Sequence, residues 1–216
     1  MNLKDIDWGS PVYVSEYLSS ISDTLRLLSG QSGLIDSAVR MLYKIWEERR
    51  SVFVIGNGGS ASTATHFCAD LFKTVVDDQE ERGIRAMALA DNIPLASALI
   101  NDWGWECLYT AQLGTLMARG DMVAAFSVHG GSGSDKAGVW SQNLLLALRF
   151  AKESGCGTIG FSGFDGGAMR ELCDVCITVP ADSTPAVESI HLVLAHLITF
   201  RLKHLIGSNP EERRLI

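Results

Sequence analysis

Two segments of the sequence each place one imidazole and one carboxylate on the same side of a predicted helix. His66 and Asp70 are four residues apart, and Glu188 and His196 are eight apart, close to two full turns. Two histidines and two carboxylates form a suitable ligand set for zinc or a similar divalent ion, and without metal they could serve as general acid and base. The alternative interpretation is structural: His66 would be a histidine near a helix N-terminus, and His196 a histidine packed in the core.

Three glycine- and serine-rich segments form a second group with potential chemistry. They are GNGGS at 56–60, SVHGGSGS at 127–134 and SGFDGG at 162–167, and each follows an apolar run. Glycine allows the backbone to approach a ligand closely, and hydroxyls with free N–H groups at a helix start can hold a phosphate. The alternative is three tight turns without a ligand. A nicotinamide or flavin site is disfavoured, because the acidic residue of such sites is expected at the end of the second strand, about 20 residues after the glycines, and here that strand ends much further along, near Asp91.

Short apolar runs separated by helix-length segments indicate the elements that position these groups. Such alternation is typical of an α/β three-layer sandwich with a five-stranded parallel sheet, in which ligands bind beyond the carboxyl ends of the strands. The predicted strands are 51–55, 84–89, 122–128, 157–161 and 173–179. The predicted helices between and after them are 60–74, 93–100, 137–154, 166–172 and 185–206.

Two further helices are predicted before the first strand, over 12–29 and 32–49. We expect them to form an antiparallel hairpin within 1–50, ahead of an α/β core at 51–206 in a single domain of 1–216. Their apolar faces are wide for helices that only cover a sheet, which indicates an oligomer interface.

The composition limits the class of partner. A net charge of −7 in 216 residues disfavours nucleic acid and membrane surfaces as partners, although it does not exclude an anionic ligand. No apolar signal core precedes residue 10, no apolar run is expected to span a membrane, and the 5 cysteines are an odd number. These features predict a cytoplasmic protein. Cys173 and Cys176 form a C-x-x-C pair that leads into a strand, so we interpret them as structural.

Taken in order, the motifs resemble the SIS (sugar isomerase) domain family, and within it the phosphoheptose isomerases. The similarity covers nearly the whole chain. It rests on GNGGS followed by HF, on the Asn101-Asp102 pair, on SGxDGG and on E-x-I-H-x-x-x-x-H. It implies homotetramers with active sites at subunit interfaces, a phosphorylated sugar substrate, isomerisation between ketose and aldose phosphates through an enediol(ate), and zinc as the cofactor. Sedoheptulose 7-phosphate and D-glycero-D-manno-heptose 7-phosphate are the implied sugars.

The resemblance also implies roles for individual residues. Asp70 and His196 would move protons, and the metal ligands would be His66, Asp70, Glu188 and His196. Substrate contacts would come from Asn57, Gly58, Ser60, Asp102, Ser127, His129, Ser132 and Glu188. Asp102 could bond sugar hydroxyls, or it could simply end a helix.

This sequence departs from the family pattern at several of these positions. Asp70 stands in place of glutamate, Glu188 in place of glutamine, and Val128 and His129 replace a threonine and a serine of the phosphate loop. An imidazole at 129 could contact phosphate when protonated. The alternative function is that of a non-catalytic SIS protein that binds a phosphosugar or a protein partner as a regulator. Retention of both histidine–carboxylate pairs favours the enzyme.

Overall fold

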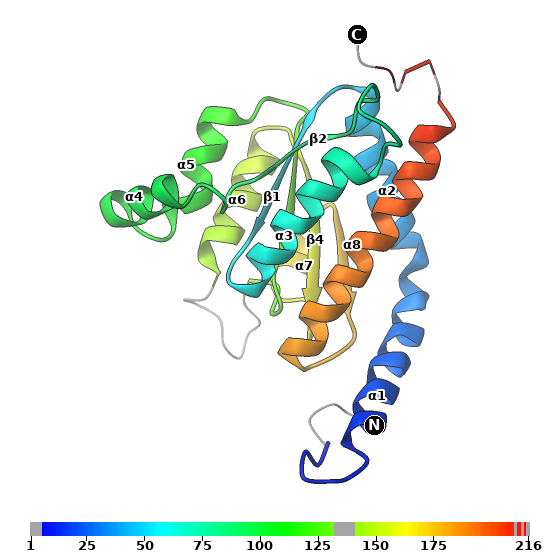
Figure 1. The fold of residues 1–216 in the computed structure, drawn as a ribbon. Coiled ribbons are helices and arrows are strands. Elements are labelled where there is room, and N and C mark those ends of the chain that lie inside the picture. The colour runs from blue at the N-terminus through cyan, green and yellow to red at the C-terminus, as the bar shows by residue number, and fades with distance from the viewer. Residues whose placement is uncertain (1–5, 132–140, 210, 213, 215–216) are drawn as a thin grey trace.

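The structure, a computed structural model, describes residues 6–131, 141–209, 211, 212 and 214. Its centre is a parallel sheet of five strands in the order β2-β1-β3-β4-β5 (Figure 1). The strands are β1 (Ser51–Gly56), β2 (Arg85–Ala88), β3 (Met122–Phe126), β4 (Gly157–Gly163) and β5 (Val175–Val179). Each overlaps a predicted strand, and the predicted α/β fold class is confirmed.

Helices cover both faces of the sheet, because the inner strands are apolar on both sides. In β1, Val52 and Val54 belong to one core cluster, while Phe53 and Ile55 belong to the other. Successive side chains of a strand point to opposite faces, so a continuous apolar run requires two covering layers. The first layer contains α2 (Ser32–Glu47), α3 (Gly59–Ala69) and α8 (Thr184–Gly207); the second contains α5 (Cys107–Leu116), α6 (Gln142–Glu153) and α7 (Met169–Leu172).

The N-terminal helices differ from the predicted hairpin. A 3₁₀ turn, Ser29–Gln31, joins α1 (Tyr13–Leu28) to α2, and Leu28, Ser29 and Ser32 all keep right-handed helical angles. The two helices therefore follow one another along the molecule instead of folding back (Figure 1). The apolar periodicity located both helices, but it contains no information about the angle between them.

Three further elements were predicted incompletely or not at all. α4 extends to Trp103 (Ile93–Trp103), and α5 was not predicted. The predicted helix at 60–74 is α3 followed by a π-helical turn, η3 (Asp70–Thr74). Residues 137–140 of the predicted helix at 137–154 lie outside the described residues.

Helix α8 corrects one expectation about apolar segments. Its 24 residues include a window with mean hydropathy 1.2, so by length and composition alone the helix could cross a membrane. In the molecule, 44% of that window is buried, and Val187, Ile190 and Leu194 pack in the core against the sheet. Burial as a core helix accounts for this composition.

Candidate active site

His66, Asp70 and His196 come together where α3 and α8 lie side by side (Figure 1). The Nε2 atoms of His66 and His196 are 3.1 Å apart. Oδ2 of Asp70 lies 3.6 Å from Nε2 of His66 and 3.7 Å from Nε2 of His196. The spacing of His66 and Asp70 along the helix predicted their proximity, whereas the approach of His196 depends on how the two helices pack.

The burial of this cluster differs between its members. The side chain of Asp70 is 12% exposed, whereas the two imidazoles are about half exposed at 47% and 46%. Oδ2 of Asp70 is buried and has no hydrogen-bond partner among the described residues. A buried carboxylate oxygen is normally satisfied, and this one faces two imidazole nitrogens. Two nitrogens and one carboxylate oxygen around a common point fit a divalent ion such as zinc, with the exposed side left open for a substrate.

The π-helical turn η3 begins at Asp70 itself. The N–H of Val75 donates to the carbonyl of Asp70 at 3.2 Å, five residues back. The segment before β2 packs closely on this turn: a Cβ added to Gly83 would lie only 1.9 Å from the carbonyl oxygen of Phe72, and the N–H of Ile84 donates to Leu71 at 2.8 Å. Single π-turns in helices frequently occur at functional sites.

The GNGGS segment forms the turn from β1 into α3. Gly58 has a φ of 56°, which favours glycine, and a Cβ on Gly56 would lie 2.4 Å from the carbonyl oxygen of Ser60. Asn57 exchanges two amide hydrogen bonds with Asn143, at 2.9 and 3.0 Å. The hydroxyl of Tyr109 donates to the carbonyl of Gly56 at 2.5 Å, and burial raises the pKa of Tyr109 to about 12. The turn is therefore held rigidly, with Ser60 buried at its end.

The loop after β3 packs backbone to backbone on the loop after β4. A Cβ on Gly130 would lie 1.9 Å from the carbonyl oxygen of Gly166, and one on Gly167 would lie 2.3 Å from that of His129. The hydroxyl of Ser127 accepts a hydrogen bond from the N–H of Gly131 at 3.2 Å. The ring of His129 lies 4.2 Å from that of Phe164, centre to centre.

Ser132, a predicted phosphate contact in this loop, lies outside the described residues.

Glu188 and Asp102 are not brought to the histidine–aspartate cluster. A Cβ on Gly59 would lie 2.5 Å from Oε1 of Glu188, so this carboxylate lies at the start of α3. Eight residues of helix separate it from His196, a rise of about 12 Å. Within one chain the expected set of four metal ligands is therefore reduced to three, because a shared helix face does not place two groups at one point. Asp102 is exposed near the end of α4, which projects at the left of Figure 1, whereas α8 lies on the right.

Several residues that shape the site carried no functional signal in the sequence. Asn143 and Tyr109 reach the GNGGS turn from α6 and α5, and only the fold shows this. Thr74 donates a hydrogen bond to Asp70, and its spacing of four residues from Asp70 is the only feature of the sequence that indicates this contact. His191 of α8 is fully buried, with Nε2 3.1 Å from the carbonyl oxygen of Ser162, and burial lowers its pKa to about 4.

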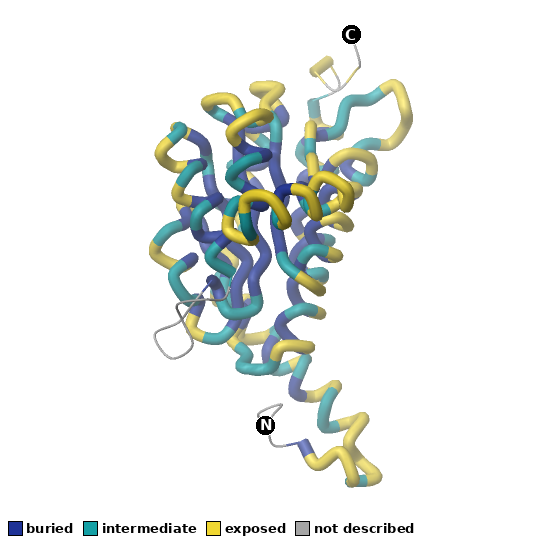
Figure 2. The backbone as a smooth tube through the Cα atoms, turned by 90° about the vertical axis from the view of Figure 1, so that its left-hand side faces the viewer, coloured by how far each residue is buried: buried dark blue, intermediate teal, exposed yellow. Residues whose placement is uncertain are grey.

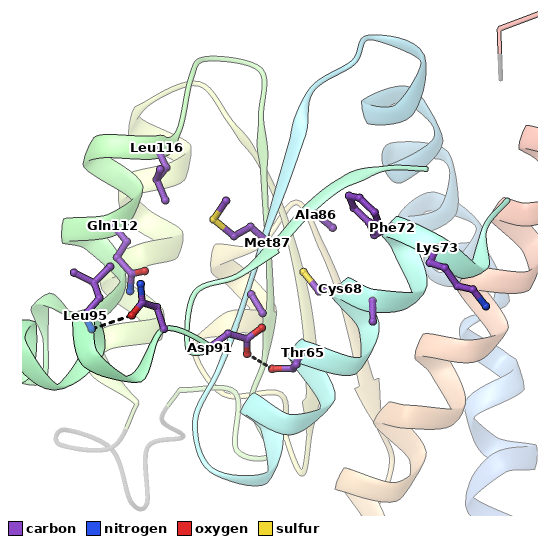
Figure 3. A pocket seen from close by; sticks show the side chains of 13 residues that line it. Thr65, Cys68, Phe72, Lys73, Ala86, Met87, Asp91, Leu95, Gln112 and Leu116 are labelled. Atoms are coloured by element: carbon purple, nitrogen blue, oxygen red, sulfur yellow. Dashed lines mark hydrogen bonds between the residues drawn. The ribbon is translucent and has the colours of Figure 1, made fainter. Parts of the chain in front are cut away.

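A separate groove of about 710 Å³ lies between α3, β2, α4 and α5 (Figure 3). Its lining is mainly apolar, with Cys68, Phe72 and Met87 among the residues shown. Thr65 and Asp91 hydrogen-bond each other at 2.5 Å on its lower side. Burial raises the pKa of Cys68 to about 12, so this thiol is not activated. None of the predicted site residues lines this groove.

No protein-family model matches the sequence, but comparison with known proteins finds similar sequences and similar structures. A phosphoheptose isomerase of Geotalea daltonii is 37% identical over 177 residues, covering 80% of this chain and 85% of that protein. The lincomycin biosynthesis protein LmbN of Streptomyces lincolnensis is 38% identical over 191 residues, 86% of this chain and 68% of that protein. The structure of a phosphoheptose isomerase from Francisella tularensis superposes with a TM-score of 0.79 at 22% identity, covering 88% and 96% of the two chains, which shows a shared fold.

Proposed function

This chain belongs to the phosphoheptose isomerase family, and from that membership we propose that it interconverts sedoheptulose 7-phosphate and D-glycero-D-manno-heptose 7-phosphate. One observation carries the proposal: the cluster of His66, Asp70 and His196, in which the buried oxygen of Asp70 has no hydrogen-bond partner within the described part of the chain. The two half-exposed imidazoles give the cluster one side that is open to a bound sugar.

The reaction requires a proton to move between two neighbouring carbons. A base removes the proton next to the carbonyl to give a cis-enediol(ate), and reprotonation at the other carbon completes the isomerisation. We assign the transfer to Asp70 and His196, whose Oδ2 and Nε2 atoms are 3.7 Å apart. A divalent ion held by His66, Asp70 and His196, which we propose to be zinc, would stabilise the developing negative charge as a Lewis acid.

We place the phosphate at the N-terminal end of α3, with Ser60, Ser127 and the neighbouring N–H groups. This helix end carries partial positive charge, and Gly56 and Gly58 let the backbone approach an anion. Asn57 would be presented to the substrate in the orientation that Asn143 imposes on it. His129 lies in the packed loop beside Phe164 and would add a contact to the phosphate when protonated.

The length of α3 supports a seven-carbon sugar. His66 lies seven residues after Gly59, a rise of about 10 Å. An extended chain covers about 3.5 Å in three bonds, so the roughly seven bonds from C2 to phosphorus of a heptulose 7-phosphate span about 8 Å. The difference between these two lengths is taken up by the contacts of the sugar with the cluster at one end and of the phosphate with the start of α3 at the other.

We further propose a cytoplasmic homotetramer whose active sites lie at subunit interfaces, with no nucleic acid or membrane as a partner. Apolar side chains on the N-terminal segment and α1 are exposed, and Figure 2 shows this part of the chain extending from the body of the molecule. They include Trp8, Val12, Tyr13, Val14, Leu18 and Leu27. A neighbouring copy that covers them would also supply groups such as Asp102, which one chain does not bring to the cluster.

The test is turnover of sedoheptulose 7-phosphate by the purified chain, followed by NMR with and without added zinc. Formation of an aldose heptose 7-phosphate that depends on zinc is the expected result. Binding of the phosphosugar without product, also across a panel of five- to eight-carbon ketose phosphates, would refute the enzymatic proposal and indicate a regulator that only binds the sugar.

A further inference from the structure

Thr74 donates its hydroxyl to a carboxylate in its own helical turn, whereas several other helical threonines of this chain bond only the backbone of theirs. Thr24, Thr63 and Thr115 each donate their hydroxyl to the backbone carbonyl four residues earlier, the usual arrangement in a helix. The hydroxyl of Thr74 instead donates to a side chain, Oδ1 of Asp70, at 2.9 Å.

Thr74 and Asp70 are the last and first residues of the π-helical turn. In η3, the carbonyl of Asp70 accepts its hydrogen bond from the N–H of Val75, five residues later. Thr74 is the last residue of this wider turn, and its hydroxyl is placed beside the carboxylate of Asp70. Gly83 and Ile84 hold the same turn from the side of β2. The backbone of the turn that carries Thr74 is therefore held by packing.

The hydrogen bond from Thr74 gives the two carboxylate oxygens of Asp70 different roles. Oδ1 is held by the hydroxyl, so Oδ2 is the oxygen that faces His66 and His196, at 3.6 and 3.7 Å. Oδ2 is also the buried oxygen for which the described residues supply no hydrogen-bond partner. Without the hydroxyl, the carboxylate could rotate, and ordering it around an ion would cost conformational entropy.

We propose that Thr74 is a positioning residue that orients the Asp70 carboxylate for binding a divalent ion between His66, Asp70 and His196. The proposal rests on the metal site of the proposed function, but it concerns the affinity for the ion and not the identity of the sugar. Groups that hydrogen-bond a metal-ligating carboxylate commonly contribute a factor of about 10 to 100 in metal affinity.

The experiment measures zinc affinity of the metal-free full chain by competition with a chromophoric chelator, and records the visible absorption spectrum of the cobalt(II) form. Thr74→Val removes the hydroxyl and keeps the shape of the side chain, whereas Thr74→Ser keeps the hydroxyl. Thr115→Val is the matched control, because Thr115 is an exposed helical threonine on α5, remote from the cluster. Thermal melting of each metal-free variant monitors folding.

We expect zinc affinity to fall about 10- to 100-fold in Thr74→Val, with an altered cobalt spectrum, and to be retained in Thr74→Ser and Thr115→Val. Equal affinity in Thr74→Val and wild type would overturn the proposal, as would equal losses in the Val and Ser variants or absence of metal binding by the wild type. A wild type that binds zinc in this pattern but does not isomerise the sugar would leave the role of Thr74 intact and refute the proposed function instead.

Discussion

Replacing Glu188 with glutamine is expected to strengthen binding of the phosphosugar. The carboxylate of Glu188 lies against the first residue of α3, since a Cβ on Gly59 would lie 2.5 Å from Oε1. The N-terminal end of a helix attracts anions, and we propose that the substrate phosphate binds there. Two negative groups would then occupy the same region, and glutamine removes one charge while keeping the size of the side chain.

The size of the effect follows from this geometry. A phosphate hydrogen-bonded to the first N–H groups of α3 would lie roughly 7 Å from the carboxylate, for hydrogen bonds of about 3 Å. Each pair of unit charges at that distance repels by about 0.6 kcal/mol in water and about 2.4 kcal/mol at an effective dielectric constant of 20. Glu188 is half-buried, so we take about 1.5 kcal/mol, which corresponds to about tenfold in affinity.

The assay is the KM and kcat of isomerisation, together with calorimetric binding of sedoheptulose 7-phosphate at two salt concentrations. Glu188→Gln should lower KM about tenfold at unchanged kcat, and the gain should shrink at high salt. Glu153→Gln, an exposed charge at the end of α6, is the control and should change neither constant. An unchanged or raised KM would show that the phosphate does not bind at the start of α3. Loss of zinc affinity in Glu188→Gln would show that Glu188 does contact the ion.

Three further predictions follow from other contacts. His196→Ala should abolish isomerisation and leave the melting temperature nearly unchanged, since the side chain is 46% exposed; normal turnover would refute our proton-transfer assignment. Asn143→Leu leaves the Asn57 amide unpaired and should raise KM while lowering the free energy of unfolding by about 1–3 kcal/mol, measured by urea denaturation. Burial lowers the pKa of His191 to about 4, below the ordinary value of 6.5, so the unfolded chain takes up the proton first and stability should fall as pH drops from 6.5 towards 4. His191→Gln should flatten that part of the pH–stability curve, and an unchanged slope would contradict this account.

The sequence was sufficient to predict the parallel sheet and its two covering layers. Strands such as β1 are apolar on both faces, and that pattern demands helices on both sides wherever the strands pair. The sequence was insufficient to predict how α1 and α2 are arranged. The short polar connection between them is compatible both with a reversal of the chain direction and with a helix that continues in the same direction. α5 was missed because Cys107–Leu116 has no distinct polar face, so its helical period leaves little trace in the sequence.

The candidate site shows the same division between local and distant information. Four residues of helix already place His66 and Asp70 together, so this pair is determined by sequence alone. His196 lies 130 residues beyond His66, and from the sequence we expected both it and Glu188 to meet that pair. Because of the way α8 packs on α3, His196 meets the pair, and Glu188 lies instead at the start of α3. Hydrogen bonds between neighbouring residues set the helical period, so a sequence shows which residues share a helix face. The relative position of two helices depends instead on how their side chains fit together, which only the tertiary structure shows.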